Sequence, residues 1–434
     1  MKRTQKWLKL DNAAKIYPAA KTKNWTNIYR LSATLKEDID PDILAKSLND
    51  IKRRFPSICV KLKAGIFWYY LEEIDNAPEV CEEGGYTCMR MKFSDIKKCA
   101  FRVLYYKNRI TTEFFHSLTD GNGALIFLKT LTATYLENKY GIDVPHENGV
   151  LDISRIARRD ELEDSFLKYS GKVSMGRKDT DAYIYKGTHI LEDFTPLITG
   201  EIAVEDIKKR AKEYNVSITT YLAAVMTDAL QQMQAEEIKR VRSRKPIKIL
   251  LPVNLRSFYP SNTLRNFVLY IIPGIKPNMG HYSFDEIVKS IHHQMGYELT
   301  EKQMNSRIVT NVRDELNPIV RIIPLFMKNL VMKIIYNMSG EKKSTITISN
   351  LGDVKLPEIM NDYIDRFDFI LTPQLTLPGN CSVISYKGKM YISFDCCLAC
   401  EMATNMKNFQ EANDEIYTLI RSSHWQKSER ILNA

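Results

Sequence analysis

The sequence predicts a mixed α/β (α+β) fold that is built from two layered subdomains. Strand-like and helix-like patterns are interleaved in both halves of the chain, which is typical of packed layers of sheet and helix. The 434 residues are too many for one ordinary core and enough for two. The chain contains no short repeat of fixed period, and this excludes solenoids and propellers.

The first half is predicted to contain two helices and two hairpins. Apolar residues at helical spacing predict a helix over 40–54. Near period-two alternation predicts hairpins over 57–73 and 100–115, and the second hairpin ends directly at His116. A glycine-rich turn and an apolar stripe then predict a helix that stops near Gly141.

The crossover between the two subdomains is predicted over residues 145–188, where the sequence becomes polar and mixed in charge. We therefore divide the chain into residues 1–170 and 171–434. The second part repeats the mixture of elements, with predicted helices over 204–215, 218–233 and 409–423, strands over 246–256 and 344–352, and a hairpin over 381–397.

The most apolar stretch covers residues 317–338, but three cations and two prolines interrupt it. A bilayer span needs about 20 nearly uncharged residues, so no transmembrane segment is expected. The stretch is instead predicted to form a helix pair that lines a core or a hydrophobic pocket.

The charge balance suggests an anionic partner, because 62 Lys and Arg exceed 52 Asp and Glu by 10. Nucleic acid, a membrane surface and a phosphate-bearing cofactor all fit that charge. Nucleic acid is not expected, because the basic clusters are not interleaved with aromatic residues.

The eight cysteines and the absence of an apolar export segment near residue 1 favour the reducing cytoplasm. Cys397 and Cys400 have neither a second cysteine pair nor histidines at zinc spacing. No metal is therefore expected, and the adjacent pair His292 and His293 is interpreted as structural.

Among the seven histidines, only His116 lies at a predicted strand end that a glycine-rich turn follows. A neutral imidazole there can take a proton from an attacking hydroxyl or amine and return it to the leaving group. Asp120 would point away from the cleft and lock the loop through a buried pair with an arginine. Gly121 and Gly123 permit close approach of the backbone. The alternative is that His116 is a hydrogen-bonded turn residue.

Residues 116–121, His-Ser-Leu-Thr-Asp-Gly, resemble the HxxxDG motif of the superfamily that contains chloramphenicol acetyltransferase, condensation domains, plant BAHD acyltransferases and alcohol acetyltransferases. Residues 251–267 resemble a second element of that superfamily, with Arg256 and Asn266 at the matching places. Residues 347–357 resemble the Ser-Asn-x-Gly segment of bacterial alcohol acetyltransferase-like members. With the stretches at 10–19 and 55–73, which are also expected in that branch, the resemblance covers nearly the whole chain.

This resemblance implies two chloramphenicol acetyltransferase-like subdomains, each a mixed sheet with helices, and an active-site channel between them. Many condensation domains carry a second histidine where this chain has Phe115, a departure that favours the acyltransferase branch. The implied roles are general base for His116, a structural pair for Asp120 and Arg256, close backbone approach for Gly121, structural support for Asn266, and either an oxyanion site or the polar end of a strand for Ser349 and Asn350.

The implied activity is transfer of an acyl group, with acetyl as the first choice, from an acyl-CoA to an alcohol hydroxyl without a covalent enzyme intermediate. The excess positive charge would help bind the phosphates of coenzyme A. Two alternatives remain open: a freestanding condensation-type transferase that uses an acyl or peptidyl donor on a carrier protein, and a non-catalytic binding module. Signature motifs of serine hydrolases, P-loop proteins and zincins are absent from the sequence.

Overall fold

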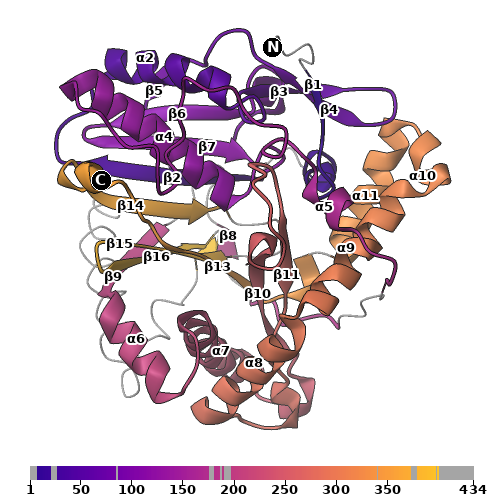
Figure 1. Ribbon diagram of the computed structural model, residues 1–434. Coiled ribbons are helices and arrows are strands. Elements are labelled where there is room, and N and C mark those ends of the chain that lie inside the picture. Colours follow the sequence, from indigo (N-terminus) through magenta and orange to yellow (C-terminus); the bar gives the residue numbers. More distant parts are fainter. Residues whose placement is uncertain are drawn as a thin grey trace.

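Two mixed sheets, drawn one above the other in Figure 1, form the centre of the molecule, and each has helices against it. The structure is a computed structural model that describes residues 7–20, 27–84, 87–174, 180–185, 188–189, 197–339, 341–372, 379–396 and 398–399. Each sheet has its own cluster of buried apolar side chains. The predicted mixed α/β fold is therefore confirmed.

The first sheet has five strands in the order β14–β2–β7–β6–β5. Its one parallel pair is β5 with β6, and the other neighbours are antiparallel. Two helices, α2 and α4, pack against each other and cover the sheet in Figure 1. The bounds are β2 (Ile28–Leu35), α2 (Pro41–Ile51), β5 (Val80–Glu82), β6 (Phe101–Tyr106), β7 (Arg109–Phe115), α4 (Gly121–Tyr140) and β14 (Ile364–Leu371).

The predicted helices at 40–54 and before Gly141 are confirmed as α2 and α4. Helix α4 ends where Gly141 adopts φ +68°, a left-handed conformation that glycine tolerates best. The predicted hairpin at 100–115 is confirmed as β6 and β7.

The second sheet runs in the order β11–β10–β13–β15–β16–β9, and a short strand β12 also pairs with β10. Strands β10, β13 and β15 are parallel, whereas β16 and β9 are antiparallel to their neighbours, so this sheet is mixed too. Helices α6, α7 and α8 lie below it in Figure 1. The bounds are β9 (Leu197–Ala203), α6 (Val204–Glu213), α7 (Ile218–Glu237), β10 (Ile247–Asn254), β11 (Val268–Ile271), β12 (Gly274–Ile275), α8 (Phe284–Glu298), β13 (Ile346–Asp353), β15 (Gly379–Tyr386) and β16 (Lys389–Cys396).

Strand β14 comes from the second part of the chain but belongs to the first sheet. It pairs antiparallel with β2 from Ile364 opposite Leu35 to Leu371 opposite Tyr29. The division at residue 170 stays a prediction, and a boundary drawn there leaves one strand of the first sheet in residues 171–434.

One side of the molecule combines a small three-stranded sheet with the last helices before β13 (Figure 1). The sheet consists of β1 (Trp7–Lys9), β4 (Tyr69–Glu73) and β3 (Val60–Ala64), so the predicted hairpin at 57–73 is confirmed as β3 and β4. The neighbouring helices are α1 (Ile16–Ala20), α9 (Glu301–Leu316), α10 (Pro318–Ile322) and α11 (Leu325–Ser339), and the remaining short elements are α3 (Phe93–Ile96), α5 (Ser165–Tyr169), β8 (Thr188–His189) and β17 (Leu398–Ala399).

The helix pair predicted at 317–338 is present as α10 and α11, which separate just before Leu325, where Pro324 interrupts the helical pattern. Its burial differs from the expectation, because Ile322, Phe326 and Leu330 are 70%, 74% and 64% exposed. No helix of the described residues is long and apolar enough to cross a bilayer. The predicted helix at 409–423 and the pair Cys397 and Cys400 lie outside the described residues.

Candidate active site

His116 directly follows β7, and its side chain is half-buried. Its backbone N–H donates to the carbonyl of Asn27 at 2.9 Å, which ties the end of β7 to the residue before β2. The imidazole stacks on the ring of Tyr17 from α1, with centroids 4.5 Å apart and planes 21° apart. The ring of Tyr29 lies 5.0 Å away on β2. Two aromatic side chains therefore fix the orientation of the imidazole.

Burial lowers the pKa of His116 below its ordinary value of 6.5, because desolvation disfavours the charged imidazolium. Contact with its own backbone carbonyl, the charge of Asp120 and the amide of Asn266 act in the opposite direction and raise that pKa. The Nδ1 atom is buried and has no partner of regular hydrogen-bond geometry in the described part of the chain. The ring is consequently neutral near pH 7.

Asp120 is the N-cap of α4 and is 2% exposed. One carboxylate oxygen, Oδ1, accepts from the backbone N–H of Gly123 at 3.1 Å. The other, Oδ2, accepts from Arg256 Nη1 at 2.7 Å and from the backbone N–H of Phe267 at 2.9 Å. The carboxylate thus joins the motif loop, which is residues 116–120 between β7 and α4, to residues 256–267. It faces away from solvent.

Arg256 lies in a 3-10 turn (Leu255–Ser257) just after β10. Besides Asp120, its guanidinium donates to the carbonyl oxygens of Thr263 at 2.7 Å and Arg265 at 2.8 Å. The structure therefore brings together Asp120 and Arg256, the two residues that are predicted from the sequence to pair. Loss of one partner from such a buried pair costs about 3–5 kcal/mol, because it leaves an uncompensated charge.

The glycines of the motif stand where other chain segments approach closely. A Cβ atom on Gly121 would lie 2.6 Å from Leu351 Cδ2, and one on Gly123 would collide with Thr119 Oγ1 and the carbonyl of Leu264. Leu351 lies in β13, next to Asn350. The segment 347–357 is therefore packed onto the start of α4.

Ser349 and Asn350 are half-buried within β13. The Asn350 side chain donates to Thr219 Oγ1 at 3.3 Å and accepts from the backbone N–H of Gly352 at 2.8 Å. These bonds fit the strand-closing alternative for Asn350, and the oxyanion role of both residues stays a prediction.

A buried cluster beside His116 contains two residues that no sequence motif marks, Asp11 and Arg265. Asp11 Oδ2 accepts from Asn266 Nδ2 at 3.3 Å and lies 3.6 Å from Arg265 Nε. Burial raises the pKa of Asp11, while Arg265 and Asn266 lower it. Asn266 thus connects this cluster to the imidazole.

Asp11 and Tyr17 both lie within residues 10–19. The only feature of the sequence that indicates them is the resemblance of this stretch to bacterial alcohol acetyltransferase-like members. Neither Asp11 nor Tyr17 belongs to a short motif with fixed spacing between its residues. In the structure this stretch also receives the hydroxyl of Ser117, which donates to the carbonyl of Ala14 at 3.1 Å. The four segments 10–19, 116–123, 251–267 and 347–357 therefore meet at one place.

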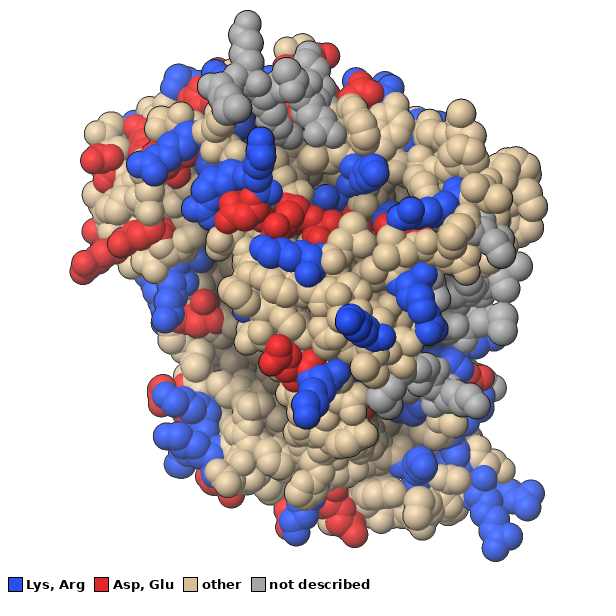
Figure 2. All heavy atoms as spheres, turned by 45° about the vertical axis from the view of Figure 1, so that its right-hand side comes forward, with Lys and Arg blue, Asp and Glu red and all other residues tan. Residues whose placement is uncertain are grey.

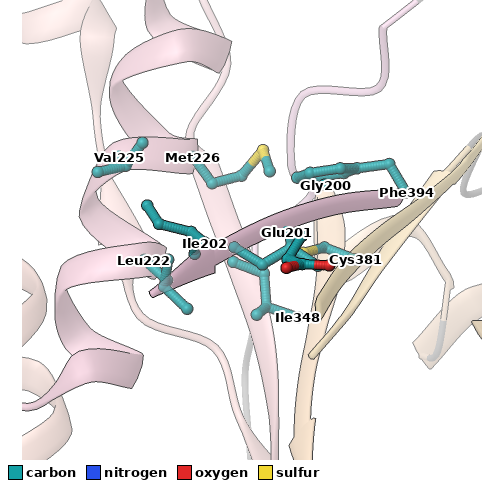
Figure 3. Close-up of a pocket in the computed structure, with 10 residues that line it drawn as sticks. Gly200, Glu201, Ile202, Leu222, Val225, Met226, Ile348, Cys381 and Phe394 are labelled. Carbon is teal, nitrogen blue, oxygen red and sulfur yellow. The ribbon is translucent and has the colours of Figure 1, made fainter. Parts of the chain in front are cut away.

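A small cavity of about 50 Å³ lies in the second lobe, by which we mean the second sheet and its helices, where side chains from α7 face side chains from the sheet (Figure 3). Ligand sites commonly enclose about 300–1,000 Å³, so this one is too small for a substrate. Its wall is mainly apolar and is lined by Gly200, Glu201, Ile202, Leu222, Val225, Met226, Ile348, Cys381, Ile392 and Phe394.

A second cavity, of about 770 Å³, falls in the range of ligand sites. It lies between β1, the β3–β4 hairpin and the helices α5, α9 and α10. Arg265 and Asp164 contribute to its wall, and burial raises the pKa of Asp164 to about 6. His116 lines neither of these two cavities, so the channel through His116 stays a prediction.

The arrangement can perform proton transfer at a half-buried, neutral imidazole. Among the described residues, no group of three or more metal-ligating side chains gathers.

Comparison with protein-family models found no match, and comparison with curated proteins found none. Solved structures with the same fold include TRI101 from F. graminearum complexed with coenzyme A and T-2 mycotoxin, with a TM-score of 0.62, 12% identity and coverage of 94% of this chain and 98% of that one. The wax ester synthase/diacylglycerol acyltransferase from Marinobacter aquaeolei VT8 gives a TM-score of 0.55, 12% identity and coverage of 92% and 97%.

The starter condensation domain of rhizomide synthetase gives a TM-score of 0.58 at 12% identity, with coverage of 96% of this chain and 94% of that one. The chain therefore has the fold that these acyltransferases and condensation domains share, as its motifs predicted. The similarity extends over both lobes.

Proposed function

We propose that the chain transfers an acyl group from an acyl-CoA thioester to an alcohol hydroxyl, with His116 as general base. The observation that carries this proposal is a neutral, half-buried imidazole packed against two aromatic rings, at the point where four of the resembling segments meet. The fold supports it, because one similar structure, TRI101, is a complex with coenzyme A and T-2 mycotoxin. Acetyl is the acyl group that we expect first.

In the proposed reaction, the imidazole removes the proton of the acceptor hydroxyl as its oxygen attacks the thioester carbonyl. A tetrahedral oxyanion forms, and hydrogen-bond donors stabilise it; Ser349 and Asn350 are our candidates. The carbon–sulfur bond then breaks, and the imidazolium returns the proton to the departing thiolate. The products are an ester and free coenzyme A, and no covalent bond to the protein is formed.

The proposed role of Asp120 and Arg256 is to hold the loop that carries His116 in place. Their pair connects the start of α4 to the end of β10. Both are positioning residues, because the Asp120 carboxylate bonds to Gly123, Arg256 and Phe267.

The acyltransferase reaction is favoured over peptide-bond formation by Phe115. This side chain, in the place where many condensation domains carry a histidine, is fully buried in the first core.

We also propose that the protein is located in the cytoplasm. This proposal is supported by five cysteines of the described residues that are free thiols, namely Cys59, Cys81, Cys88, Cys99 and Cys381.

The test is release of free thiol when the purified protein is given acetyl-CoA and a mixture of alcohols. We expect release by the wild type and a loss of at least about 100-fold in His116→Ala, the usual contribution of a general base. His146→Ala is the matched control, because about half of this side chain, 49%, is exposed to solvent.

Thiol release that is unchanged in His116→Ala would contradict the catalytic role. Transfer from a carrier-protein thioester, with none from acetyl-CoA, would favour the condensation-type alternative. Binding of both substrates without transfer would favour a binding module.

A further inference from the structure

An apolar corner of the molecule is formed by the β3–β4 turn and by α10 and α11. Single exposed apolar residues are common on protein surfaces, but contiguous groups mark interaction sites. Here seven of the twenty large apolar side chains that are exposed in the described part of the chain fall within two short segments, and they are Ile66, Phe67, Ile322, Phe326, Met327, Leu330 and Val331.

The corner is one surface, because backbone and side-chain contacts tie its segments together. The N–H of Leu325, at the start of α11, donates to the carbonyl of Ile66 at 2.9 Å. Lys328 Nζ donates to the carbonyl of Phe67 at 3.0 Å and lies 3.7 Å from the ring centroid of Trp68. These contacts therefore hold the turn and the helix against each other.

In the first turns of α11, apolar side chains face solvent and a charged side chain faces the interior. Phe326, Met327, Leu330 and Val331 follow the i, i+1, i+4, i+5 spacing of one helix face, and their exposures are 74%, 49%, 64% and 49%. The cation Lys328 is on the inner side and only 3% exposed. A helix that faces water in this way leaves apolar area uncovered, which is unfavourable unless another apolar phase covers it.

The charge around the corner is mostly positive, and the nearby carboxylates of Glu72 and Glu315 are paired with Lys61 and Lys15. Residues 7–10, 61–70 and 316–331 contain five cations and no Asp or Glu, namely Lys9, Lys61, Lys63, Arg321 and Lys328. Lys61 is paired with Glu72 on β4, whereas Lys9 and Arg321 are exposed. Figure 2, which brings this side of the molecule forward, shows a broad area at upper right with few charged side chains. Apolar side chains with nearby cations are typical of surfaces that bind anionic lipid.

We propose that the apolar corner binds the surface of a negatively charged membrane, with the apolar side chains inserted among the lipid head groups. The protein would lie on the bilayer, since no described helix is long and apolar enough to cross it. This inference does not depend on the proposed transfer reaction, because it concerns binding without substrate.

The test is co-sedimentation of the full chain with vesicles of phosphatidylcholine, with and without phosphatidylglycerol. We expect binding to the vesicles that contain phosphatidylglycerol, and weaker binding at high salt because salt screens the charges. The double variant Phe326→Ser/Leu330→Ser should bind at least about tenfold more weakly, because two large side chains no longer leave water.

The matched control is Met279→Ser/Tyr297→Ser, which removes two apolar side chains that are 76% and 69% exposed near and on α8. It should bind vesicles like the wild type, and circular dichroism should show that both double variants are folded. Equal binding by the corner variant and the wild type, or no sedimentation of the wild type with anionic vesicles, would overturn the proposal. A dimer that forms without vesicles and is lost in the corner variant would assign the surface to a second copy instead.

Discussion

The imidazole of His116 is controlled by one residue of its own motif, Asp120, and by two residues that are far from it in sequence, Tyr17 and Asn266. Tyr17 stacks on it, Asp120 and Asn266 raise its pKa, and burial lowers that pKa more strongly. The net shift is downward, so the base form is populated at lower pH than for a free histidine.

The pH dependence of the proposed reaction follows from this shift. Activity requires neutral His116, so the initial rate of thiol release should fall with decreasing pH at a midpoint below 6.5, the ordinary value. Asn266→Ala removes a group that raises the pKa and should move the midpoint to still lower pH. Rate measurements between about pH 5 and 8 check this; a midpoint above 6.5 would show that burial does not dominate.

The residues with a fixed local spacing could be predicted from the sequence, and the others could not. His116, Asp120 and Gly121 belong to one short motif, and Arg256 and Asn266 belong to another. Asp11 meets Asn266 across 255 residues of chain, and no local pattern marks a carboxylate that becomes buried only through such a contact.

At the scale of elements, the start of α4 depends on the packing of the motif loop. The Thr119 hydroxyl donates to the carbonyl of Leu264 at 2.6 Å, and the Tyr29 hydroxyl donates to the carbonyls of Thr119 and Asp120 at 2.9 and 3.0 Å. The helix therefore begins in a loop that Tyr29 from β2 and the backbone of Leu264 together hold in place.

The two motif glycines should differ in their tolerance of alanine. Gly123→Ala should lower the free energy of unfolding by about 3 kcal/mol, because its Cβ meets the backbone carbonyl of Leu264, which has little room to move. Gly121→Ala should cost less than about 1 kcal/mol, because the tip of Leu351 can rotate and alanine favours the helix. Urea denaturation measures both, and equal losses would contradict this account.

Hairpins and amphipathic helices could be predicted, whereas β2 and β14 were missed. In β2 seven of the eight residues are buried, so apolar and polar positions do not alternate, and the strand contains Arg30, whose guanidinium is paired with Glu83. Strand β14 carries Asp365, Arg366 and Asp368 among apolar residues. Tertiary contacts decide the conformation of both segments.

At the scale of the molecule, β14 connects the lobes. Phe367 in β14 is fully buried in the first core, and its ring lies 5.1 Å from that of Tyr386 in β15 of the second sheet. The two sheets therefore share packing.

Removal of that ring should weaken both lobes together. Phe367→Ala should lower the free energy of unfolding by about 3–5 kcal/mol, the usual cost of deleting a buried phenylalanine. Tryptophan fluorescence and far-UV circular dichroism should give the same lowered midpoint, while Tyr297→Ala, at an exposed position on α8, should change stability by less than about 0.5 kcal/mol. Separate midpoints for the two signals would show that the lobes unfold independently.

The position of β14 also determines which fragments of the chain keep the first sheet complete. A fragment that stops at residue 170 would expose the backbone donors and acceptors of β2 that β14 satisfies in the intact chain. Such an open edge recruits strands from other molecules, so the fragment alone would be prone to aggregation, and adding residues 364–371 through a linker would be the way to keep it monomeric.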